Sequence, residues 1–163
     1  SSMHEWLRLS RRCLLFVLGK HPHARMNPPS EEDVNAFAQA VGWKCPLLLE
    51  ERVCGACDGL KLPIQQSSDF SKQNPLHNGW QGNTHINSVF VFSPDGLIRM
   101  ATINCPGSWH DSNVADYGIH KKMKTVYDKC RGKAVVDSAF RLKDGNCLIQ
   151  SAQDDPCPKN ATH

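Results

Sequence analysis

The sequence predicts an α/β domain built on a mixed β-sheet. Apolar residues at helical spacing mark the chain before residue 43, whereas short β-type runs separated by turn residues follow from residue 53. These runs are ordered as a strand, a hairpin of two strands, a helix and another strand. That order favours an antiparallel hairpin beside strands that are connected through a helix.

Two helices are expected in the N-terminal quarter. Apolar residues at helical spacing predict a helix from Met3 to about Val17. The proline-containing segment 21–30 cannot continue that helix and predicts a linker. A second helix is expected after Ser30, a typical N-cap that is followed by an acidic residue three positions later, and Gly42 is expected to end it.

The expected strands begin near residue 52. Residues 52–59 form a strand-like run with Asp58 near its end, and residues 67–84 are expected to be a long polar loop. Residues 85–93 and 97–104 have the pattern of a hairpin whose turn is Pro-Asp-Gly. Two neighbouring antiparallel strands are therefore predicted next to the strand that carries Asp58.

The last third of the chain is expected to supply one more helix and one more strand. Residues 105–112 form a loop rich in turn residues, and residues 111–129 predict a helix. In the run 133–140, the residues between Lys133 and Asp137 are all apolar, which predicts a central strand. The predicted organisation is an N-terminal helical segment (1–44), an α/β domain (45–150) and a disordered tail (151–163).

Composition sets only broad limits on function. At 163 residues the chain has the length of one domain with a sizeable core, and a formal charge of +3 permits contact with a polyanion without arguing for it. The basic residues gather in two clusters: Arg8, Arg11, Arg12, Lys20 and Arg25, and then Lys121, Lys122, Lys124, Lys129, Arg131 and Lys133. Both clusters fit a solvated surface as well as a contact with phosphates.

The eight cysteines do not predict a disulfide framework, because the chain is long and rich in apolar runs and shows no convincing secretion signal. The apolar run after Arg12 is interrupted by Gly19 and Lys20 and is shorter than the roughly 20 residues that cross a bilayer. We therefore expect an intracellular protein with reduced thiols and no contact with a membrane.

Three aspartates are the strongest functional signal in the sequence. Asp58, Asp111 and Asp137 each close a short apolar run, and a small residue follows each of them. Burying a carboxylate costs several kcal/mol unless a partner compensates its charge, so a packing role does not explain them. If their segments lie side by side, the three carboxylates would form a pocket for hard divalent cations.

Each aspartate also has a structural explanation. Asp58 precedes Gly59, a common turn dipeptide, although the strand pattern then resumes and a bulge in a continuing strand fits equally well. Asp111 stands where a helix is expected to begin, so it or Ser112 could cap that helix. Asp137 could also be a cap, but it follows a buried-type run without a turn dipeptide, so this alternative is weakest there.

Other candidate ligands are less specific. Cys54 and Cys57 form a C-x-x-C pair, but no second pair of cysteines or histidines has the spacing of a zinc site, and on a regular strand the two thiols point to opposite faces. A zinc module is accordingly a minor alternative. His85 and His110 could lie near the aspartates, although a lone histidine is more often an ordinary surface or core residue.

Three blocks of the sequence resemble one known family. They are "ACDGLKLPI", "GWQGNTHINSVFVFSPDGLIRMATINCPGSWHDSNV" and "KAVVDSAFRL". In this order they are similar to the DDE-superfamily endonuclease domain of PIF/Harbinger-type transposases and of their domesticated relatives. The resemblance covers roughly residues 53–142.

The resemblance implies a fold, a cofactor and a substrate. The fold is ribonuclease H-like, a mixed sheet flanked by helices, and the reaction is Mg²⁺- or Mn²⁺-dependent cleavage of double-stranded DNA. By motif, Asp58 and Asp137 match the first and second catalytic aspartates, and Asp111 matches a further acidic position at the metal site. A nuclear location and a separate DNA-binding partner protein are also implied.

The chain departs from the family pattern at two places. Ala139 and Phe140 replace the usual Gly-Tyr, and no glutamate follows Asp137, although the family's third acidic residue lies about 35 residues further on. We therefore expect a C-terminally truncated domain without its last helix and with impaired cleavage. A non-catalytic, domesticated DNA- or protein-binding module is the alternative, and whether the chain is an enzyme stays open.

Overall fold

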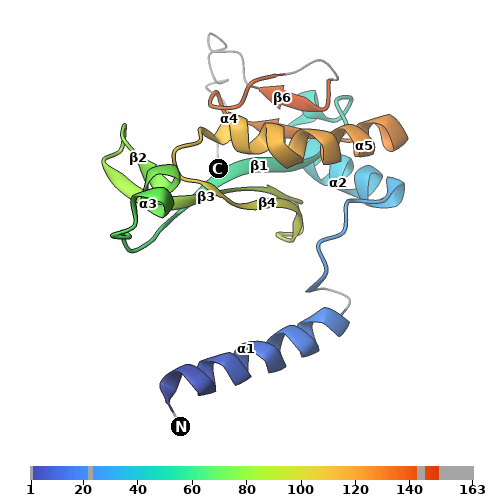
Figure 1. Ribbon diagram of the computed structural model, residues 1–163. Helices are drawn as coiled ribbons and strands as arrows, with labels where there is room; N and C mark the ends of the chain where they lie inside the picture. The colour runs from blue at the N-terminus through green and yellow to red at the C-terminus, as the bar shows by residue number, and fades with distance from the viewer. Residues whose placement is uncertain (1, 22–23, 143–145, 151–163) are drawn as a thin grey trace.

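The computed structural model describes residues 2–21, 24–142 and 146–150. Its body is a six-stranded sheet in which β2, β3, β1, β5 and β6 are neighbours in that order and β4 pairs with β3 (Figure 1). The strands are β1 (Val53–Pro63), β2 (His77–Asn78), β3 (Asn83–Phe92), β4 (Ile98–Pro106), β5 (Lys133–Val136) and β6 (Leu148–Gln150).

The sheet is mixed, as predicted. Strand β3 runs antiparallel to both β1 and β4, whereas β5 runs parallel to β1 and to β6. Both parallel neighbours therefore lie on one side of β1, and the antiparallel hairpin lies on the other side. This confirms the α/β class, and the arrangement is consistent with a ribonuclease H-like fold.

Helices lie on the sheet and at the N-terminus. They are α1 (Met3–Lys20), α2 (Glu31–Lys44), α3 (Phe70–Leu76), α4 (Asp111–Val114) and α5 (His120–Cys130), with a 3₁₀ turn at Pro46–Leu48. A π-helical segment, Ala115–Ile119, joins α4 to α5, so the helix expected over residues 111–129 is confirmed as one continuous rod. Helix α1 stands away from the body and buries none of its residues (Figure 1).

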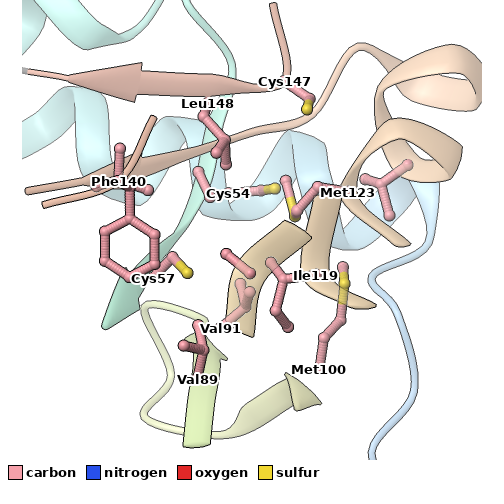
Figure 2. Packing of buried hydrophobic residues seen from close by; sticks show 14 of the residues in the cluster. Cys54, Cys57, Val89, Val91, Met100, Ile119, Met123, Phe140, Cys147 and Leu148 are labelled. Atoms are coloured by element: carbon pink, nitrogen blue, oxygen red, sulfur yellow. The ribbon is translucent and has the colours of Figure 1, made fainter. Parts of the chain in front are cut away.

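One hydrophobic core lies between the sheet and the α4–α5 rod. Figure 2 shows Val89 and Val91 of β3 facing Ile119 and Met123 of the rod, all of which are almost fully buried. Cys54 and Cys57 both belong to this cluster, so the expectation that they point to opposite faces was wrong. The register of β1 against β5 shifts between Val53 and Gly55, which interrupts the simple alternation of side chains.

The zinc alternative finds no support in these two thiols. Burial is the main cause that raises the pKa of Cys54 and of Cys57 to about 12, so both remain protonated at neutral pH. The described part of the chain holds no group of three or more His, Cys, Asp and Glu side chains that could hold a metal ion. Both cysteines are core residues.

Strand β1 is longer than expected and carries Asp58 in its middle. It does not reverse at Asp58-Gly59 but continues to Pro63, because β3 pairs with it from Ala56 to Pro63. Of the two alternatives for this dipeptide, the continuing strand is correct. The irregularity lies at Val53–Gly55 and not at Asp58.

Several local expectations were wrong. Residues 67–84 are not one loop, because Asp69 caps the short helix α3 with its side chain and β2 then pairs with the start of β3. Strand β6 was not predicted. Helix α2 runs through Gly42, whose missing side chain leaves room for Leu49: an added Cβ would lie 2.7 Å from its Cδ1. The tail predicted at 151–163 lies outside the described residues.

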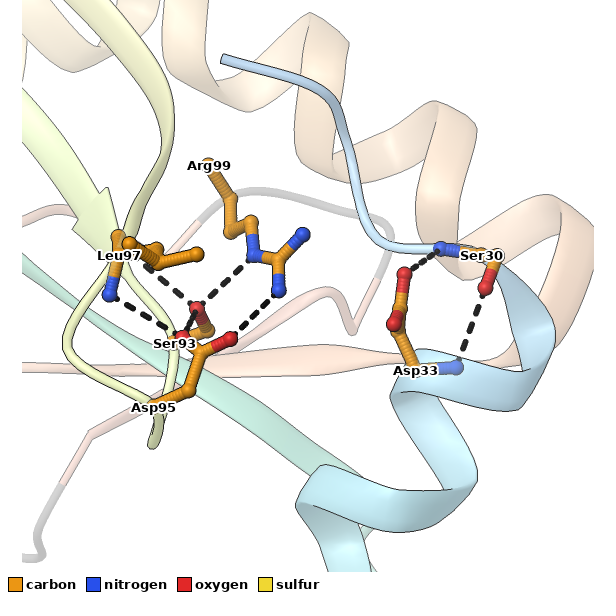
Figure 3. Close-up of polar contacts among 6 residues, drawn as sticks. All are labelled: Ser30, Asp33, Ser93, Asp95, Leu97 and Arg99. Atoms are coloured by element: carbon orange, nitrogen blue, oxygen red, sulfur yellow. Dashed lines mark hydrogen bonds and ion pairs between the residues drawn. The ribbon is translucent and has the colours of Figure 1, made fainter. Parts of the chain in front are cut away.

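Two polar networks fix the ends of these elements (Figure 3). The Ser30 Oγ accepts a hydrogen bond from the Asp33 N–H at 3.1 Å, and the Asp33 carboxylate accepts one from the Ser30 N–H at 2.9 Å. In the β3–β4 turn, Asp95 accepts hydrogen bonds from Ser93 and Leu97 and pairs with Arg99, and the Ser93 hydroxyl is the largest cause that lowers the Asp95 pKa. Both interactions match the expected cap and turn.

Replacing the α2 cap tests how firmly this helix is held to the body. We expect Ser30→Ala to lower the free energy of unfolding by about 1 kcal/mol, because the Asp33 N–H loses the Ser30 hydroxyl that accepts its hydrogen bond. Urea unfolding measures this change. Ser2→Ala, at the corresponding position of α1, should leave the midpoint unchanged, since α1 buries no residue; equal losses in the two variants would contradict the prediction.

Candidate catalytic site

Asp58 and Asp137 are neighbours across the parallel pair β1–β5. Cys57 lies opposite Val136 in the register. Asp58 directly follows Cys57, and Asp137 directly follows Val136. Neighbouring strands lie roughly 4.8 Å apart, so the two backbones bring these carboxylates to adjacent positions where β5 ends. Both residues are exposed. The structure thus brings together the first two of the predicted site residues.

Each of these carboxylates is oriented by a backbone donor. Asp58 Oδ1 accepts a hydrogen bond from the Gly59 N–H at 2.7 Å, and Asp137 Oδ1 accepts one from the Ala139 N–H at 2.9 Å. Within the described residues, the Oδ2 atoms of both aspartates have no hydrogen-bond partner. One oxygen of each side chain is fixed, and the other is available to a ligand.

Asp111 reaches β1 from the helix side. It is the first residue of α4, and its carboxylate packs against Gly59: a Cβ added there would lie 2.7 Å from Asp111 Oδ2. Successive residues of a strand point to opposite faces. Asp111 packs on the face of β1 that carries Gly59, so Asp58 projects from the opposite face. Asp111 is therefore next to the pair without completing a cluster with it.

Cys57 provides an electrostatic measure of how the three charges are placed. Its pKa is raised first by burial and then by repulsion from Asp58, Asp137 and Asp111, in that order of size. One buried thiol thus senses all three carboxylates. The prediction that they act on a common metal ion stays a prediction.

Asn87 was missed by sequence reasoning and holds Asp111 in place. It is completely buried on β3, and its Nδ2 donates to Asp111 Oδ1 at 2.8 Å and to the Trp109 carbonyl at 3.1 Å. Its own oxygen accepts from the Ser88 N–H at 2.8 Å. A polar residue inside the apolar run 85–93 was the available signal, because a buried amide needs partners.

Ser112 connects the start of α4 to the segment that follows Asp137. Its hydroxyl donates to the Ala139 carbonyl at 3.0 Å and accepts from the Arg141 N–H at 2.8 Å. Ser112 is buried and was considered only as a helix cap. The helix that begins at Asp111 and the loop after Asp137 are consequently fixed to each other.

The donor set fits a hard divalent cation. Asp58 and Asp137 offer only carboxylate oxygens, and Mg²⁺ is commonly held by one or two carboxylates together with waters and substrate phosphates. A group of three protein ligands is therefore not required for binding. Asp111 could contribute a further oxygen from the helix side only if its side chain moved from Gly59.

His85 lies close enough to Asp111 to be influenced by its charge. The ring is 1% exposed, with Nδ1 2.9 Å from Asn83 Oδ1 and no partner for Nε2 among the described residues. Its pKa is lowered, mainly by burial and further by Lys61, while Asp111 acts in the opposite sense. His85 is therefore a neutral buried imidazole, whereas His110 is exposed.

The second basic cluster is largely engaged by other groups. Lys124 pairs with Asp128 at 2.9 Å and Lys133 pairs with Glu51, while Lys122 donates to the Ala101 carbonyl at 2.6 Å. A phosphate would have to displace these partners. This cluster is better explained as a solvated surface than as a DNA contact.

The comparison with known families decides the class of the protein. The model of the DDE superfamily endonuclease family matches residues 57–162, which is more than half of the chain. The chain belongs to this family. No curated protein and no solved structure matches it. Asp58, Asp111 and Asp137 all lie inside the matched segment, whereas α1 and α2 precede it.

Membership places the chain among transposase-derived nucleases that act on DNA and generally use a divalent metal. Among the described residues, no helix is long and apolar enough to cross a membrane.

The contact between Gly59 and Asp111 can be tested by filling it. We expect Gly59→Ala to lower the free energy of unfolding by about 1–3 kcal/mol, because its methyl group must displace the Asp111 carboxylate from Asn87. Adding Asp111→Ala should restore part of this loss. Gly19→Ala is the control, since nothing lies within 4 Å of that position; a Gly59→Ala midpoint equal to the control would reject the contact.

His85 should make stability depend on pH. Its folded-state pKa lies below the ordinary value of 6.5, so protonation favours the unfolded chain. Its stabilising contribution is present above pH 6.5 and is lost as the pH falls from there toward the folded-state pKa. The free energy of unfolding, measured in urea between about pH 7 and pH 5, should fall less steeply in His85→Gln than in the wild type.

The exposed His4 provides the control for this comparison. His4→Gln should follow the wild-type slope, because that histidine lies on α1 and is exposed. Parallel slopes for the wild type and His85→Gln would show that His85 does not titrate differently in the folded and unfolded chains.

Proposed function

We propose that this chain is a divalent-metal-dependent DNA endonuclease domain of Harbinger-type transposase origin, in which Asp58 and Asp137 bind Mg²⁺ or Mn²⁺. The observation that supports this proposal is the pairing of Cys57 with Val136 on β1 and β5, because Asp58 and Asp137 are the residues that directly follow this pair, within the segment that matches the family. The Harbinger assignment rests on the Pro-Gly-Ser-Trp-His-Asp-Ser block and the two strand-borne aspartates.

The residues of the chain prepare the site for phosphodiester cleavage. The Gly59 and Ala139 N–H groups fix one oxygen of each aspartate, so the other oxygen is oriented before a ligand arrives. A bound divalent cation supplies an activated water and stabilises charge on the phosphate oxygens. Asn87 and Ser112 act indirectly: the first orients Asp111, and the second holds the loop after Asp137 against α4.

Asp58 and Asp137 are two ligands, and the remaining positions around a cation would be filled by waters and substrate phosphates. A small set of protein ligands fixes the geometry of a cation less firmly than a larger one, and fixed geometry is much of what the protein contributes. We infer that the domain acts on double-stranded DNA in the nucleus, aided by a separate DNA-binding protein.

A non-catalytic module that binds DNA or a protein is the second candidate. One observation favours it: among the described residues, no group of three or more metal-binding side chains is assembled. In such a module the fold and its surface remain useful after cleavage is lost. The two candidates differ in whether a divalent cation binds at Asp58 and Asp137.

A nicking assay on supercoiled DNA with Mg²⁺ or Mn²⁺ tests the proposal. Asp58→Asn and Asp137→Asn should each lower the rate by more than the roughly 10- to 100-fold that loss of an outer-shell partner costs, because each removes a direct ligand. Mn²⁺ binding, followed by electron paramagnetic resonance, should weaken in the same variants. Asp128→Asn is the control, since that exposed carboxylate pairs only with Lys124.

The outcomes separate the two candidates. Unchanged nicking and unchanged Mn²⁺ binding in both aspartate variants would reject this metal site. A wild-type chain that binds DNA but neither nicks it nor binds Mn²⁺ would establish the non-catalytic module instead.

A further inference from the structure

A cleft of about 580 Å³ lies between β1, the turn that joins β2 to β3 and the loop before α4, and none of the three aspartates lines it. Its lining includes Lys61, Asn78, Trp80, Gln81, Trp109 and His110. Lys61 follows Asp58 on β1, and His110 directly precedes Asp111. The volume is typical of a site for a small ligand or part of a larger one, and the lining combines indole rings, a cation and neutral hydrogen-bonding groups.

Trp80 has no packing role that explains it. It is 97% exposed on the turn between β2 and β3, so almost none of its apolar surface is removed from water. The turn is nevertheless well ordered by Asn78, whose Oδ1 accepts from the N–H groups of Trp80 at 3.1 Å and Gln81 at 3.0 Å. Gly82, with a φ of 65°, completes the turn through a 2.8 Å bond to the Asn78 carbonyl.

Trp109 is supported from behind. Its ring packs edge-on against the ring of Tyr117, with 5.8 Å between the two ring centroids. Its backbone carbonyl accepts a hydrogen bond from the Asn87 side-chain amide. Asn78 also connects the two sides of the cleft, because its Nδ2 donates to the Gly107 carbonyl at 2.9 Å. A Cβ at Gly107 would lie 2.1 Å from the His85 carbonyl oxygen, so only glycine allows this approach. Both tryptophans are thus presented by fixed backbone.

We propose that this cleft binds an unpaired nucleobase at the end of a DNA strand. The base stacks on Trp80, and the adjoining phosphate pairs with Lys61. Aromatic rings stack on any base because every base has a π-face, and a lysine beside them suits the phosphate backbone. The proposal rests on the proposed function for its ligand, DNA, and adds a strand-end subsite to it.

The base must be unpaired because its flat face has to be accessible to the Trp80 ring. Bases inside a duplex are stacked on each other and cannot present a face to Trp80, so a single-stranded overhang or an extruded base is required. Gln81 and His110 offer hydrogen-bonding groups without a fixed pattern of recognition, so we infer little sequence preference. The expected ligand is therefore a strand end rather than a particular base.

Binding should be measured by fluorescence anisotropy with the full chain in EDTA, so that no cleavage occurs. Two labelled probes are compared, a blunt-ended duplex annealed from two separate strands and the same duplex with a three-nucleotide single-stranded overhang. We expect the wild type to prefer the overhang probe. Trp80→Ala should weaken binding of that probe roughly 5- to 150-fold and leave the blunt probe unaffected, whereas Trp80→Phe keeps most of the affinity.

Trp43 offers a matched control. It is 93% exposed on α2, outside the cleft, so Trp43→Ala should leave both affinities unchanged. Lys61→Gln should reduce the slope of log affinity against log salt by about one. Urea unfolding should give wild-type midpoints for both tryptophan variants, because neither indole is packed.

The results that overturn this inference are distinct from those that overturn the nuclease. Absence of any preference for the overhang, or equal behaviour of Trp80→Ala and Trp43→Ala, would reject the subsite even in an active nuclease. Conversely, a chain that never cleaves DNA but loses overhang binding with Trp80→Ala would reject only the proposed function.

Discussion

The parallel pairing of β1 with β5 is the constraint on which the site depends. It sets Cys57 opposite Val136 in the core, and the next residue after each of them, Asp58 and Asp137, lies at the surface. A slip of one residue would turn every side chain of a strand to the other face and bury a carboxylate. The hydrophobic side chains beneath the sheet therefore fix the register, and the register in turn fixes the distance between the two charges.

Hydrogen-bond donors orient each of the three carboxylates. Asp58 and Asp137 each receive a backbone hydrogen bond, and Asp111 receives one from the buried amide of Asn87. The second oxygens of Asp58 and Asp137 are thereby oriented before a cation binds, so the folded chain is better prepared for a ligand than either aspartate alone suggests.

The sequence predicted features that depend on local pattern and missed those that depend on distant partners. The α2 cap and the β3–β4 turn follow from neighbouring residues and were found. Gly42 was read as a helix end because nothing nearby reveals Leu49, and Asn87 drew no attention because its partner Asp111 lies 24 residues away. The sequence analysis expected Asp58, Asp111 and Asp137 to meet only if their segments lay side by side. The pairing of β1 with β5 and the alternation of side chains along β1, which separate Asp111 from the other two, depend on contacts between distant segments.

Strand β3 joins the aspartates and the cleft into one unit. Its first residues pair with β2 below the Trp80 turn, and its middle carries Asn87, which holds both Asp111 and the Trp109 carbonyl. The same strand pairs with β1 on both sides of Asp58. A base stacked on Trp80 and the Asp111 carboxylate would therefore be positioned by the same strand, because the pairing of β2 with β3 holds the turn and Asn87 holds Asp111. Binding of a strand end in the cleft would in this way be oriented relative to α4, the helix that begins at Asp111.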